Sequence, residues 1–126
     1  MNAVIRVGII TLAAIAISAC ANRGGQYSWG NYEDGLYGYY KDPSTAARFA
    51  ESLKKSIARA EKSDAKVPPG LYAEYGNLMF QSGNYAVAIN QFNREKTLWP
   101  ESAVLMDMMI KAAAEQSQRT AAASGS

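Results

Sequence analysis

Residues 69–100 read PGLYAEYGNLMFQSGNYAVAINQFNREKTLWP, and they decide the fold. Gly83 and Asn84 form a turn signal between two segments whose apolar residues recur at helical spacing. Gly76 and Ala88 place small side chains where two antiparallel helices can cross closely. The stretch therefore predicts a helical hairpin, which makes an all-α fold the expectation for the whole chain.

The same stretch resembles a tetratricopeptide repeat in the order and spacing of its bulky, small and helix-ending residues. The matching positions are Tyr72, Tyr75, Gly76, Met79, Gly83, Asn84, Tyr85, Ala88, Phe92 and Pro100. In such a repeat, Tyr85 and Phe92 fill the space against the first helix. Glu95 departs from the pattern, because alanine is usual there. The resemblance implies tetratricopeptide-like antiparallel helical hairpins, and a generic antiparallel helix pair that shares the turn is the alternative.

Further helices are expected upstream of the hairpin. Tyr32–Lys41 shows helical spacing despite its two glycines. Asp42 and Pro43 then have the chemistry of an N-cap and of a first helical residue. The consecutive prolines Pro68 and Pro69 end the segment that follows. Its predicted apolar face consists of Ala46, Phe49, Ala50, Leu53, Ile57 and Ala60.

A last helix is expected after the hairpin, from about Glu101 to Gln118. Its predicted apolar stripe comprises Val104, Leu105, Met108, Met109 and Ala112. We expect this stripe to pack across the hairpin as part of the core, with an exposed docking surface as the alternative. Residues 27–118 thus form one predicted helical domain, and the small, polar residues 119–126 a disordered tail.

The N-terminus has the three parts of a secretory signal. Arg6 supplies the basic start, residues 7–17 are mostly apolar, and Ser18 and Ala19 are the small residues before a cleavage point at Cys20. The apolar run is too short to cross a bilayer comfortably. Residues 1–19 are therefore predicted to be a signal peptide.

Cys20 is the only cysteine, and its place after two small residues resembles the lipidation signal of bacterial lipoproteins. The resemblance implies that Cys20 becomes the N-terminus and carries diacylglycerol, usually with a third acyl chain such as palmitate. Two or more chains give lasting attachment to membrane lipid. Residues 20–26 then form a lipidated tether. Enterobacterial lipoproteins kept in the inner membrane have aspartate after the cysteine, so by this resemblance Ala21 implies the periplasmic face of the outer membrane. A plain secretory signal with an unmodified cysteine is the alternative.

The composition argues against an enzyme, a metal centre and a nucleic-acid-binding protein. Histidine is absent, which removes the commonest general base and the usual zinc ligand. The 13 basic and 11 acidic residues are interspersed, so no basic stripe points to nucleic acid. A carboxylate-pair hydrolase using Glu33 with Asp34 or Asp42 is the remaining enzymatic hypothesis, although adjacent acids at a helix start usually lie on the surface. No cofactor is expected.

Most of the tyrosines crowd into residues 27–40. Together with the lipidation signal and the hairpin, this aromatic block resembles a family of small proteobacterial lipoproteins classed as domain of unknown function 4810. The residues that carry the resemblance are Tyr27, Trp29, Gly30, Tyr32, Glu33, Leu36, Tyr37, Tyr40, Lys41 and Pro43. The resemblance implies other outer-membrane lipoproteins as partners, one of them similar to the pore component of curli transport. It carries over no catalytic residue.

Within the aromatic block, we expect Tyr27, Trp29, Tyr32, Leu36 and Tyr37 to bind the partner, since tyrosine and tryptophan are enriched at protein interfaces. Packing of these side chains in the core is an equally open alternative. The expected protein is a lipid-anchored periplasmic adaptor of an outer-membrane secretion or assembly complex. A cell-envelope lipoprotein that binds glycan or peptidoglycan is the competing hypothesis.

Overall fold

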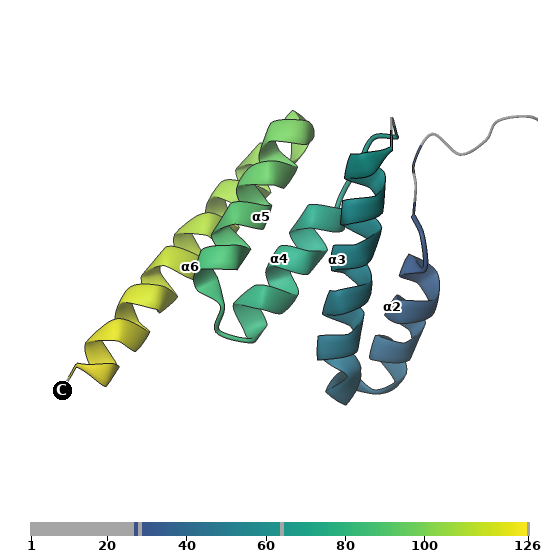
Figure 1. The fold of residues 1–126 in the computed structure, drawn as a ribbon. Coiled ribbons are helices and arrows are strands. Elements are labelled where there is room, and N and C mark those ends of the chain that lie inside the picture. Colours follow the sequence, from purple (N-terminus) through teal and green to yellow (C-terminus); the bar gives the residue numbers. More distant parts are fainter. Residues whose placement is uncertain (1–26, 28, 64, 126) are drawn as a thin grey trace, which may run out of the picture.

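The computed structural model describes residue 27, residues 29–63 and residues 65–125, and this part of the chain is built from α-helices. The helices pack side by side in chain order, each against the next (Figure 1). Their bounds are α2 Tyr32–Lys41, α3 Ala46–Lys62, α4 Leu71–Gln81, α5 Tyr85–Leu98 and α6 Ala103–Ser124. Short 3-10 turns, η1 Pro43–Thr45 and η2 Pro100–Ser102, lead into α3 and α6. The predicted all-α fold is confirmed.

The predicted signal peptide (1–19) and tether (20–26), including Cys20, lie outside the described residues. Within the described part, no helix is both long enough and apolar enough to cross a membrane.

The junction between α2 and α3 follows the predicted capping chemistry. The Asp42 carboxylate accepts a hydrogen bond of 3.0 Å from the backbone N–H of Ser44. This hydrogen bond lowers the pKa of Asp42. Pro43 occupies the first position of η1, where its missing N–H costs nothing. The chain therefore turns from α2 into α3 through a capped 3-10 turn.

The central hairpin consists of α4 and α5, and its predicted close crossing is present. A Cβ added to Gly76 would lie 2.7 Å from Cε1 of Phe92, so only glycine lets the two helices approach this closely. Ala88 and Phe92 are fully buried at the crossing. Gly83 has a φ of +80° in the turn between the helices, a backbone conformation that favours glycine.

Two apolar clusters hold the array together. The first joins α3 to α4 and receives half-buried side chains from α2. Its buried members are Phe49, Ala50, Leu53, Ile57, Ala60, Val67, Leu71, Tyr72 and Leu78. The second joins α4 and α5 to α6 around the buried residues Ala88, Phe92 and Met106. The apolar face predicted for the segment that is now α3 is thus part of the core.

The predicted core stripe of the last helix is wrong. Met106 and Ala113 are buried, and Met109 and Ile110 are partly buried. Val104, Leu105 and Met108 are instead 77%, 57% and 64% exposed, and Ala112 is exposed as well. Residues 103–110 are apolar except for Asp107, so spacing alone fits more than one face. The position of α5 decides which face is buried.

The predicted end of this helix also needs correction. The helix continues beyond Gln118 to Ser124, so the expected disordered tail is helical over residues 119–124. Alanine, glutamine and arginine are strong helix formers, and extending an existing helix requires no new nucleation. Because residues 117–121 are exposed, the last turns of α6 project from the array (Figure 1).

Candidate protein-interaction surfaces

The aromatic block begins with a chain of rings that packs on the domain. Tyr27 makes edge contacts with Trp29 and Trp99, with ring centroids 6.4 and 5.8 Å apart. Trp29 is tilted against Tyr32 at 5.4 Å, and Tyr32 lies 6.1 Å from the buried ring of Phe49. These rings therefore connect the segment before α2 to Phe49 on α3 and to Trp99 at the end of α5.

Tyr32 is also fixed by a polar contact. Its hydroxyl donates a hydrogen bond of 2.6 Å to Oε2 of Glu74 on α4. Burial, the hydrogen bond and the negative charge of Glu74 raise the pKa of Tyr32 to about 12. Leu36 is partly buried against the first apolar cluster. Three of the five predicted partner-binding residues, Tyr27, Tyr32 and Leu36, thus have contacts within the domain. Trp29 packs on Tyr27 and Tyr32 but remains 40% exposed.

Of the other aromatic residues of α2, Tyr39 stacks on the Phe49 ring, whereas two face solvent. Tyr37 is 63% exposed and Tyr40 is 87% exposed, and they lie about one helical turn apart. The ammonium group of Lys41 lies 4.7 Å from the Tyr37 ring centroid. We call Tyr37 and Tyr40 the α2 aromatic face. Tyr40 was not among the predicted partner-binding residues, although its spacing from Tyr37 was the signal that could have identified it.

A second exposed apolar surface lies on α6. It consists of Val104, Leu105 and Met108, and we call it the α6 apolar stripe. Leu105 also borders a groove of about 390 Å³ between α4 and α6, which Ala73 and Met109 help to line. From the sequence, core packing was the expectation for these three residues, and an exposed docking surface was the alternative.

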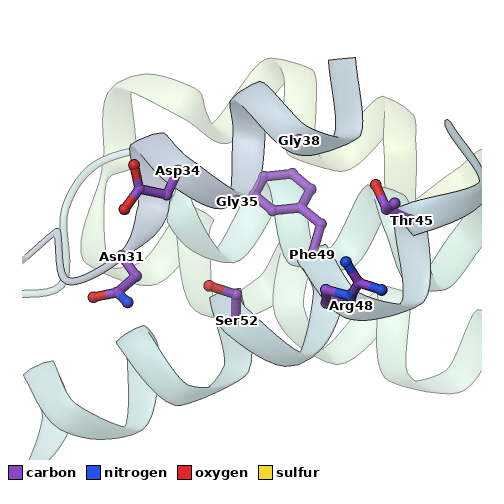
Figure 2. Close-up of a pocket in the computed structure, with 8 residues that line it drawn as sticks. All are labelled: Asn31, Asp34, Gly35, Gly38, Thr45, Arg48, Phe49 and Ser52. Atoms are coloured by element: carbon purple, nitrogen blue, oxygen red, sulfur yellow. The ribbon is translucent and has the colours of Figure 1, made fainter. Parts of the chain in front are cut away.

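A pocket of about 280 Å³ lies between α2 and α3 (Figure 2). Asp34 and Arg48 lie toward opposite sides of it, with Phe49 between them. The Phe49 ring is itself buried, and Tyr37 and Tyr40 are not among the lining residues. The pocket therefore combines polar groups of opposite charge without an accessible aromatic face.

A family model described as domain of unknown function 4810 matches residues 26–109. The chain belongs to this family. The matched region of the DUF4810 domain includes the whole aromatic block, the central hairpin and the start of α6. No curated protein and no solved structure matches the chain.

Glu95 of the DUF4810 domain is the residue that departs from the repeat pattern, and its carboxylate is buried. The residue is 2% exposed, and Oε1 accepts a hydrogen bond of 2.6 Å from the backbone N–H of Gly70. Burial raises the pKa of Glu95, while the amides of Gly70, Ala73 and Tyr72 favour its charged form. Glu95 therefore acts as a cap for the N-terminus of α4, where Gly70 offers no side chain.

The acidic residues considered for catalysis lie at the starts of helical segments in the DUF4810 domain. Glu33 and Asp34 lie exposed in the first turn of α2, where negative charge favours the helix. Asp42 caps η1. Among the described residues, no cluster of three or more His, Cys, Asp or Glu side chains could hold a metal ion.

Proposed function

We propose that this protein is a lipid-anchored, non-enzymatic adaptor at the periplasmic face of the outer membrane. In this role it binds protein partners of a secretion or assembly complex. The observation that supports the proposal is the distribution of exposed apolar side chains. The large ones of the described part belong to the first or last helix of the array or to the segment just before α2.

This distribution has a physical meaning in a helical array. Each inner helix buries its apolar side chains against neighbours on both sides, whereas terminal helices need a polar outer face to remain soluble. Here α2 exposes Tyr37 and Tyr40, and α6 exposes Val104, Leu105 and Met108. Apolar surfaces of this kind are typical of protein interaction sites.

The anchor in this proposal is Cys20, with acyl chains in the outer membrane. Confinement to the membrane raises the effective concentration of the adaptor toward a partner in the same plane. A modest contact surface is then sufficient for binding. By family resemblance, the partners are other outer-membrane lipoproteins, including one similar to the pore component of curli transport.

A glycan- or peptidoglycan-binding lipoprotein is the second candidate, and the pocket between α2 and α3, with Asn31, Asp34 and Arg48 in its lining, favours it. Sugars bind well where an aromatic face borders a concavity. The exposed rings of Tyr37 and Tyr40 lie outside this pocket, so the adaptor is the better-supported function. Sedimentation of the protein with peptidoglycan sacculi separates the two candidates, because only the second requires binding.

The adaptor is tested by capturing the tagged full-length protein from detergent-solubilised envelope. We expect the double variant Tyr37→Ala/Tyr40→Ala to recover about tenfold less partner, because aromatic anchors carry much of an interface's binding free energy. Both side chains are exposed, so thermal stability should remain close to that of the wild type. Lys62→Ala, at an exposed position on α3, is the control. Equal partner recovery by the wild type, the double variant and the control would contradict binding through the α2 aromatic face.

A further inference from the structure

One face of the last helix carries a continuous row of exposed residues. The spacing between them alternates between four and three, which is the heptad spacing of helices that pair along their length. The row begins in η2 and comprises Glu101, Leu105, Met108, Ala112, Glu115 and Arg119, all exposed. Val104 borders it and adds apolar surface.

This row lies on the exposed side of α6. The adjoining side of α6 packs against the hairpin through Met106, Met109 and Ile110. The exposed end of α6, residues 117–121, extends the row beyond the array. A second helix could therefore lie along the row, which comes near the hairpin only at Leu105, beside the groove next to α4.

We propose that α6 pairs antiparallel with α6 of a second copy of this chain. A two-fold axis beside residue 110 places Met108 next to the partner's Ala112, and Ala112 next to the partner's Met108. The same axis brings Glu101 to the partner's Arg119 at each end. Such an interface is isologous, so every contact occurs twice.

The charges select this arrangement. A parallel pair would bring Glu101 against Glu101 and Arg119 against Arg119, whereas the antiparallel pair brings opposite charges together. Within one chain these residues are about 27 Å apart along the helix, given a rise of about 1.5 Å per residue, so they cannot pair internally. In the described part of the chain, neither residue takes part in an ion pair.

The affinity of this pairing is expected to be low. Three large apolar side chains per copy bury less surface than a standard interface of about 800 Å² per partner. Glu115 faces the partner's Leu105, which is an unfavourable contact. The pair is therefore populated mainly when two chains share a membrane, an expectation that rests on the lipid anchor of the proposed function.

Cross-linking in membranes tests the pairing. The full-length double variant Met108→Cys/Ala112→Cys is treated with a short bis-maleimide in the envelope fraction, and the dimer is quantified. The chain without added cysteines controls for reaction at Cys20. We expect Glu101→Arg or Arg119→Glu alone to lower the dimer yield about fivefold, since two ion pairs become repulsive. The combined charge reversal should restore the yield to within about twofold, and Lys62→Glu should leave it unchanged.

A separate variant should strengthen the pair. Glu115→Leu replaces the charge opposite the partner's Leu105, so the dimer yield should rise about fivefold, consistent with burial of one more apolar side chain. The proposed pairing is overturned if no dimer forms. It is also overturned if the combined charge reversal gives a dimer yield as low as that of either single reversal. If the protein is missing from the membrane fraction, the proposed anchor fails. Cross-linking of the concentrated purified chain then still decides the pairing.

Discussion

The hydroxyl of Tyr32 donates a hydrogen bond of 2.6 Å to Oε2 of Glu74, 42 residues further along the chain. It connects α2 to α4, although α3 lies between them in the array. Replacing Tyr32 by phenylalanine keeps the ring on Phe49 and removes only this contact. We expect Tyr32→Phe to lower the free energy of unfolding by about 1 kcal/mol, measured by urea denaturation. Tyr40→Phe, on an exposed ring, should leave the free energy of unfolding unchanged. An equal loss in both variants would contradict a stabilising role of the Tyr32–Glu74 hydrogen bond.

The stability should fall in alkaline solution because of two tyrosines. Burial and hydrogen bonds to Glu74 and Glu61 raise the pKa values of Tyr32 and Tyr72 to about 12, from 10.0. Between these values, the unfolded chain releases protons that the folded chain retains, so the free energy of unfolding falls as pH rises. The full contribution is present below about pH 10. In denaturation curves from about pH 9 to 11.5, Tyr32→Phe/Tyr72→Phe should show a shallower decline than the wild type.

The two glycines of α2 should respond oppositely to the same substitution. A Cβ at Gly35 would lie 2.9 Å from Cδ2 of the buried Phe49, whereas a Cβ at Gly38 meets nothing within 4 Å. Gly38→Ala should raise the free energy of unfolding by about 0.5–1 kcal/mol through helix propensity. Gly35→Ala should lower it by about 1 kcal/mol, because overpacking exceeds the same gain. Thermal melting of the matched pair measures both, and a gain at both positions would show that α2 can move away from Phe49.

The buried carboxylate of Glu95 should make the domain more stable in mild acid. Because burial raises its pKa above 4.5, the folded chain binds the proton more readily than the unfolded chain. The free energy of unfolding therefore falls as pH rises through the folded pKa. Glu95→Gln keeps an acceptor for the Gly70 N–H and should weaken this pH dependence, with little loss near pH 7.

A second variant at this position isolates the capping role. Glu95→Ala leaves the Gly70 N–H unpaired and a gap beside α4, so we expect a loss of about 2 kcal/mol at neutral pH. Urea denaturation at about pH 4.5 and 7 compares the two variants. Equal stability of the alanine and glutamine variants would mean that the hydrogen bond to Gly70 contributes nothing.

Local chemistry explains which parts of the fold could be predicted from the sequence. The predicted helix Tyr32–Lys41 coincides with α2, and Asp42 with Pro43 marked the entry to α3. Gly83 marked the turn of the hairpin. Each of these signals involves residues within a few positions of one another, so the sequence alone is enough to predict these helix starts and turns.

Long-range contacts explain what could not be predicted. The partner of Tyr32 is Glu74, and the partner of Glu95 is the Gly70 amide; no local pattern relates these residues. The aromatic block is divided between packed and exposed rings for the same reason. The first half of α6 is almost uniformly apolar, so the sequence did not indicate which of its faces is buried. The position of α5 decides this and leaves Leu105 and Met108 exposed.

Site-specific photo-cross-linking in living cells tests the adaptor most directly. A photoreactive residue replaces Tyr40 on the α2 aromatic face or, as the control, Lys62 on α3; both positions are exposed. A lipid-anchored adaptor predicts a discrete protein adduct from position 40, none from position 62, and loss of the adduct when Cys20→Ser is added. No adduct at position 40, the same adducts from both positions, or an adduct unaffected by Cys20→Ser would contradict it.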